Sequence, residues 1–115
     1  MDRTTRQAVI ETAVIWKLMN KETCEIETQV KNSANIVKKL NISIYEESEK
    51  PTPSKLVIST CLQQRDAFIS QMRHDARQID KLVTTKKQLW SSIIVPLASV
   101  NSHVMPLVTR IVDDN

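Results

Sequence analysis

Glycine is absent from the 115 residues of this chain. Glycine supplies the left-handed backbone angles and the close backbone approaches on which tight hairpins and phosphate-binding loops depend. Its absence excludes the glycine-rich phosphate loop, the dinucleotide-binding fingerprint and the nucleophile elbow of hydrolases. The sequence therefore predicts few sharp corners and none of these common catalytic sites.

Histidine and cysteine are also scarce, with two of each. His74 and His103 stand in no paired metal-binding spacing, and together with Cys24 and Cys61 they are spread too widely to prescribe a site. We read both histidines as solvated residues on helix faces, and the cysteine usage indicates a reducing compartment. We expect no enzyme activity, no metal site and no cofactor.

Aromatic residues make up only 3% of the chain, although 41% of it is hydrophobic. The apolar content is thus aliphatic, which is typical of helix seams rather than of sandwich cores. The net charge of +3 comes from 16 basic and 13 acidic residues that are interspersed, which argues against a nucleic-acid-binding face. No signal-peptide pattern opens the chain and no run approaches the roughly 18 apolar residues of a transmembrane segment, so we expect a cytoplasmic or nuclear protein.

The first part of the chain carries one apolar line at helical spacing. Thr4 and Gln7 have the form of a capping box, and no proline interrupts the chain from there to Tyr45. Steps of three and four residues connect a mostly apolar line of Val9, Thr12, Trp16, Met19, Thr23, Ile26, Val30, Ser33, Val37, Leu40 and Ile44. The sequence predicts a helix over about residues 4–44, with a broader apolar surface between Val9 and Met19.

A second apolar line follows a linker at residues 45–53, where charge and two prolines occur without periodicity. Its spacing is close to the coiled-coil value, and it passes through Ile58, Leu62, Arg65, Ile69, Met72, Ala76, Ile79, Val83, Lys86, Trp90, Ile93, Leu97, Val100, Val104, Leu107 and Ile111. Its phase continues past Pro96 and Pro106, which favours a kinked continuation over a reversal. We predict a second helix over about residues 54–95 and a kinked helical extension over 96–112.

These elements predict a single all-α domain over residues 1–115, a long antiparallel, coiled-coil-like helical hairpin with a kinked C-terminal extension. In the register that pairs most opposite charges, Glu11 faces Lys87 and Glu25 faces Arg73. The second helix beyond Ile93 then overhangs the start of the first. The pattern leaves open whether residues 96–112 extend the second helix or fold back as a third.

Two groups of basic residues have alternative interpretations. Arg65 and Lys86 interrupt the second apolar line, where their stems can lie along the seam while their charges reach solvent. Alternatively, they meet acidic residues of a partner and fix its register. Arg73, Arg77 and Lys81 form a basic ridge, which we read as pairing with acidic residues of the first helix rather than as a phosphate-binding strip.

The apolar overhang predicts a surface for other helical subunits, because side chains of this size are rarely left exposed together. The predicted partner-binding residues are Ile93, Leu97, Val100, Val104, Leu107 and Ile111 on the extension, with Val14 and Leu18 on the first helix. If the extension folds back, the broad face around Val14 to Leu18 is the remaining candidate.

We therefore expect a non-catalytic structural subunit of a multi-subunit helical-bundle assembly, with a hetero-oligomer favoured. The pattern is similar in shape to short coiled-coil subunits of kinetochore, tethering and organelle-positioning complexes, a likeness that no residue motif carries. The alternatives are a self-assembling homodimeric adaptor or effector and a helical protein that binds a membrane surface. Arg110 is the only Lys or Arg from Ile93 to Val112, so membrane-surface contact is the less favoured alternative.

Overall fold

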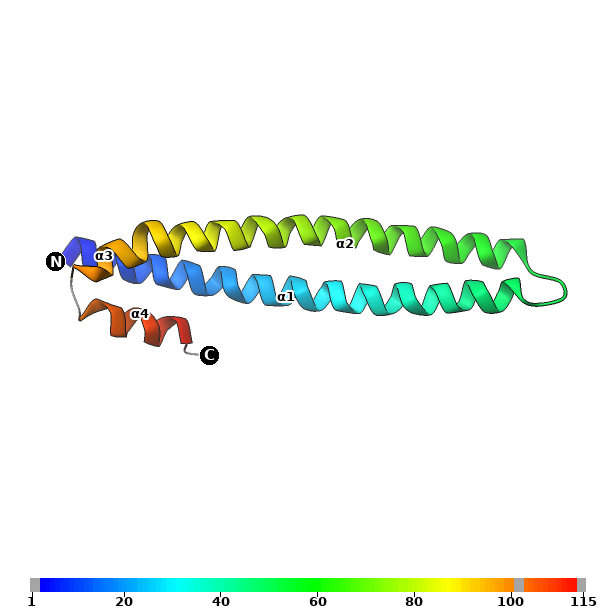
Figure 1. Cartoon of the computed structure of the whole chain (residues 1–115), viewed down its shortest axis with the longest axis horizontal. Coiled ribbons are helices and arrows are strands. Elements are labelled where there is room, and N and C mark those ends of the chain that lie inside the picture. The colour runs from blue at the N-terminus through cyan, green and yellow to red at the C-terminus, as the bar shows by residue number, and fades with distance from the viewer. Residues whose placement is uncertain (1–2, 101–102, 114–115) are drawn as a thin grey trace. The chain divides into compact units, whose positions relative to one another are not determined.

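Helices are the only regular elements among residues 3–100 and 103–113, which the computed structural model describes (Figure 1). The elements are α1 (Arg3–Ser48), α2 (Lys55–Leu89), a π-helical turn η1 (Trp90–Ile94), α3 (Val95–Ser99) and α4 (Val104–Asp113). The predicted all-α hairpin is confirmed.

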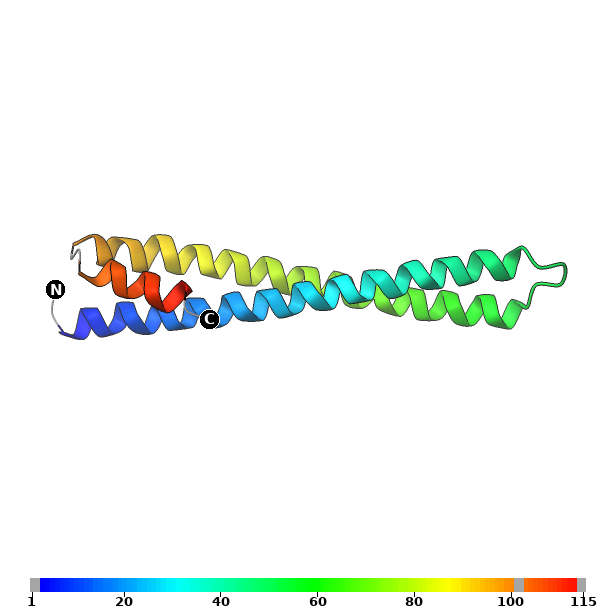
Figure 2. The ribbon, with the colours of Figure 1, turned by 90° about the horizontal axis from the view of Figure 1, so that it is seen from below.

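The chain divides into two compact units. Unit 1 comprises Met1–Cys24 and Asp80–Asn115, and unit 2 comprises Glu25–Ile79. Within each unit, α1 and α2 lie side by side and run antiparallel (Figures 1 and 2). The single domain over the whole chain stays a prediction.

Helix α1 is longer at both ends than the sequence predicts. It begins at Arg3, so Thr4 lies inside the helix instead of capping it, and the side chain of Gln7 donates to Glu11 Oε1 at 3.1 Å instead of reaching back to the cap. The helix continues to Ser48, since neither proline nor glycine interrupts it before Pro51.

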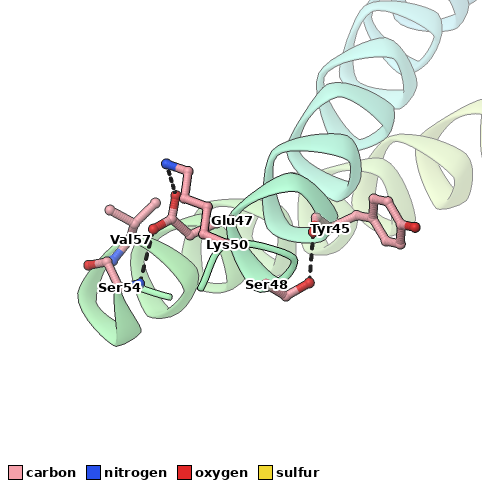
Figure 3. A network of polar contacts seen from close by, with 6 residues as sticks. All are labelled: Tyr45, Glu47, Ser48, Lys50, Ser54 and Val57. Carbon is pink, nitrogen blue, oxygen red and sulfur yellow. Dashed lines mark hydrogen bonds and ion pairs between the residues drawn. The ribbon is translucent and has the colours of Figure 1, made fainter. Parts of the chain in front are cut away.

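The loop between α1 and α2 is held by the side chains of Glu47 and Ser54 in unit 2 (Figure 3). Glu47 accepts a hydrogen bond from the Ser54 amide at 3.0 Å and pairs with Lys50 Nζ at 2.6 Å. The hydrogen bond from Lys50, followed by that from the Ser54 amide, lowers the pKa of Glu47 because both favour the ionised carboxylate. Ser54 Oγ in turn accepts from the Val57 amide at 3.3 Å, an N-cap that starts α2 at Lys55, one residue after the predicted start.

A hydrogen bond across the hairpin shows which residues of α1 and α2 lie opposite each other in each unit. In unit 1, Lys86 Nζ donates to Asn20 Oδ1 at 2.9 Å. In unit 2, Arg65 Nη1 donates to Asn41 Oδ1 at 3.3 Å. Arg65 and Lys86, the two basic residues of the second apolar line, therefore both donate to asparagine side chains of α1.

The predicted register is wrong by about two helical turns, because it would place Gln78, not Lys86, opposite Asn20. Glu25 and Arg73 consequently do not oppose each other in unit 2. Exposed ion pairs are worth only some tenths of a kcal/mol, too little to choose a register against the partly buried hydrogen bond of Lys86 with Asn20. The sequence-based choice relied on the weaker signal.

The apolar core lies in unit 1, where α4 folds back against the start of α1 (Figures 1 and 2). Its buried residues are Val9, Ala13, Ile94, Ala98, Val104 and Val108. The expected continuation of the second helix therefore ends at Ser99, and the C-terminal segment forms a third helix of this unit. Pro106 is the third residue of α4, where its missing amide removes no intrahelical hydrogen bond.

Pro96 explains the π-helical turn that precedes α3. A proline ring clashes with the carbonyl four residues earlier, and a π turn relieves such a clash by widening the helix. The Val95 amide here donates to the Trp90 carbonyl, five residues back. The wider turn rotates the following side chains, so that Ile94 and Ala98 are buried more deeply than Ile93 and Leu97 of the predicted line.

Candidate interaction surfaces

An open hollow of about 610 Å³ lies on unit 1, and we call it the tryptophan hollow. Its residues come from α1, α2 and η1: Trp16, Val83, Lys86, Lys87, Trp90 and Ser91. Trp16 and Trp90 are the only tryptophans of the chain. A hollow of this size with apolar walls and a few polar groups is typical of ligand and peptide sites.

The two tryptophans form an aromatic pair beneath a cation. Their ring centroids are 5.5 Å apart and the planes are inclined by 51°. Lys86 Nζ lies 5.4 Å from the centroid of the Trp16 ring while it donates to Asn20. The ring face and the amide oxygen both attract the ammonium group, so this side chain is held in place.

Lys87 adds a second positive charge to the hollow. It is exposed, and no carboxylate of the part of the chain that the structure describes pairs with it. Apolar walls beside two ammonium groups suit a ligand that presents an apolar side chain next to a negative charge.

A second surface of unit 1 is the outer face of α1, which consists of Val14, Ile15 and Leu18, with Glu11 one turn before them and Lys21 and Glu22 one turn after. These residues follow one another at spacings of three and four, so they share one side of the helix. Leu18 is 61% exposed. No lysine or arginine of residues 3–100 and 103–113 pairs with either glutamate.

The predicted partner-binding residues separate into three groups. Val104 is only 1% exposed and belongs to the core, and Ile93, Leu97, Leu107 and Ile111 are half-buried. Val100, at 74%, is the one extension residue among them that is exposed, and Val14 and Leu18 are exposed as well. The predicted overhang is wrong, because α4 folds back and buries Val104 and Val108 in the core of unit 1. The face around Val14 to Leu18 therefore remains as the predicted partner-binding surface.

Sequence reasoning placed Trp16 and Trp90 on the apolar lines but missed the hollow between them. Finding it required the correct register, which sets Trp16 beside Trp90 and Lys86. One available signal was the position of Lys86 four residues before Trp90 on the same line.

A buried carboxylate lies in the seam of unit 2. Asp75 is 5% exposed, and its Oδ1 accepts from Gln71 Nε2 at 2.9 Å. Its Oδ2 has no hydrogen-bond partner among the described residues. The predicted line placed Ala76 at this position, but Ala76 is exposed.

The described residues form neither a metal-binding cluster nor a membrane-spanning helix. No group of three or more His, Cys, Asp or Glu side chains there could hold a metal ion. No helix in the same residues is long and apolar enough to cross a membrane.

The chain matches no protein-family model, and comparison with curated proteins and with solved structures finds no significant similarity.

Proposed function

We propose that this protein is a non-catalytic structural subunit of a multi-subunit helical assembly and acts through protein–protein contact. The observation that carries the proposal is the balance of apolar side chains. Among the described residues, ten large hydrophobic side chains are exposed while six hydrophobic residues are buried. Burying more of these exposed side chains would stabilise a chain that folds and works without a partner.

The placement of these side chains supports contact with helices. Val14, Ile15 and Leu18 form a compact patch on one side of α1. Apolar residues at such spacing are the anchors by which one amphipathic helix packs on another. A hetero-oligomer, in a cytoplasmic or nuclear setting, is the arrangement we favour.

Membrane-surface binding is less favoured than protein contact. The apolar side of α4 contributes Val104 and Val108 to the core of unit 1, so the most apolar helix has little surface left for lipid. Arg110 is its only basic residue. Liposome flotation with anionic vesicles checks this alternative, and we expect the protein to remain with the unbound fraction.

The test is purification of the tagged full chain from its native cells, followed by native mass spectrometry. We expect a complex with other polypeptides in fixed stoichiometry, which Leu18→Glu disrupts and Leu56→Glu leaves intact. Leu56 is a matched control, because it is also an exposed leucine but lies in unit 2. A species of 13.2 kDa with no stoichiometric partner of any kind would contradict the proposal.

A further inference from the structure

We propose that the tryptophan hollow of one copy receives the outer face of α1 from a second copy of this chain. This inference rests on the proposed function and names one contact within the assembly. Both surfaces belong to unit 1, and α1 contributes to both. Trp16 of the hollow is two residues from Val14 and from Leu18, so it lies on a different side of α1 from them.

The shapes of the two surfaces suit each other. The hollow has apolar walls built on Trp16 and Trp90, and the outer face presents the exposed side chains of Val14, Ile15 and Leu18. Side chains of two adjacent helical turns can enter an open hollow of about 610 Å³ together. Burying them there removes two exposed apolar surfaces at once.

The charges are also complementary. Lys86 and Lys87 stand at the hollow, while on the outer face Glu11 and Glu22 outnumber the one lysine, Lys21. None of these five groups forms an ion pair within residues 3–100 and 103–113. Docking brings carboxylates to the two ammonium groups, which orients the helix and excludes arrangements that would place like charges together.

A second copy is the simplest occupant because one chain carries both halves of the contact. Because the hollow and the outer face lie on different sides of α1, the contact joins copies head to tail. A pair of copies held in this way keeps one hollow and one outer face unoccupied.

The experiment measures the association of the purified full chain by sedimentation equilibrium, with tryptophan emission as a second readout. Both tryptophans line the hollow, so emission reports directly on its occupancy. We expect species of two or more copies of the 13.2 kDa chain, whose dissociation shifts the emission to longer wavelength and whose dissociation constant rises with salt.

Four variants identify the surfaces. Leu18→Glu on the outer face and Lys87→Glu at the hollow should each raise the dissociation constant at least tenfold. Leu56→Glu in unit 2 and Lys81→Glu, an exposed lysine that does not line the hollow, should leave it within twofold. Far-UV circular dichroism of every variant should match the wild type, because all four side chains are exposed.

Mixing two defective variants provides the sharpest comparison. Leu18→Glu retains its hollow and Lys87→Glu retains its outer face, so a mixed pair can form one intact contact. The mixture should associate more tightly than either variant alone.

Three results would overturn the inference: a monomer at every concentration tested, self-association weakened equally by Leu56→Glu, or a mixture no tighter than its components. A monomer that still co-purifies with a different subunit overturns this contact and leaves the proposed function standing. Self-association without any other subunit supports the contact and contradicts the hetero-oligomer.

Discussion

At the scale of single residues, two asparagines of α1 show the register of the hairpin. Asn20 and Asn41 each accept a hydrogen bond from the basic residue opposite, and the pair in unit 1 is partly buried. Polar groups in a helical seam cost some stability, but they penalise every register in which they are left unpaired. Lys86 thus donates to α1, whereas Arg65 donates to α1 and also pairs with Asp66 of its own helix at 3.5 Å.

The pair in unit 1 can be measured by a double-mutant cycle of Asn20→Leu and Lys86→Leu. We expect each single change to lower the free energy of unfolding by about 1 kcal/mol, because each leaves one polar group unpaired in the seam. The free energy of unfolding of the double variant should be no lower than that of the less stable single variant. Urea denaturation followed by circular dichroism measures all four proteins, and strictly additive losses would contradict the pairing.

At the scale of elements, the α1–α2 loop depends on the ionised form of Glu47. Its pKa is lowered by Lys50 and the Ser54 amide, so its contribution to stability is complete above the unfolded value near 4.5 and is lost as pH falls through the lower folded value. The hydrogen bond to Glu47 raises the pKa of Lys50. The stabilisation that the charged Lys50 contributes is therefore lost only when pH rises beyond 10.5.

We therefore expect acid to release the start of α2. Hydrogen exchange of the Ser54 amide, corrected for its intrinsic rate, should lose protection as pH drops below 4.5. Glu47→Gln should show the weakly protected behaviour at every pH. Equal protection of Ser54 in both proteins at neutral pH would contradict the role of this carboxylate.

Helix α4 provides a second comparison at this scale, between two valines that the sequence pattern treated alike. Val104→Asp places a charge in the core of unit 1 and should lower the free energy of unfolding by roughly 3 kcal/mol or more. Val100→Asp lies on the surface and should change it by less than about 0.5 kcal/mol. Thermal unfolding of both variants checks the difference, and equal effects would show that α4 is not docked.

At the scale of the whole molecule, the two units differ in the kind of residue that is buried in each. Every fully buried hydrophobic residue of the described chain belongs to unit 1, whereas the buried residues of unit 2 are the polar Ser33, Glu47 and Asp75. Local stability follows buried apolar contacts.

Amide hydrogen exchange should therefore distinguish the units. We expect slower exchange around Val9, Ala13 and Ile94 than in the helices of unit 2 at the same pH. Exchange at one uniform rate throughout α1 would instead indicate that the chain opens in a single step.

The sequence was sufficient for the helices and the hairpin, because apolar spacing and the prolines of the linker are local signals. It was not sufficient for the register of the hairpin or for the position of α4, because both depend on several weak interactions between residues far apart in the sequence. The register followed Asn20 and Asn41, which carry no periodic signal, and the fold-back of α4 followed from the cover it gives Val9 and Ala13. The candidate site was half found, since Val14 and Leu18 were named and the hollow was not.

The π-helical turn at Trp90–Ile94 has a consequence for how the length of this chain can vary. Elsewhere in a helical seam, one inserted or deleted residue rotates all later side chains by about 100° and removes them from their partners. A π turn already contains the equivalent of one inserted residue. Removal of a single residue here, together with Pro96→Ala, would return the turn to α-helical geometry without disturbing the core on either side. We expect length variation among relatives of this protein to concentrate at this turn and at the loop between α1 and α2.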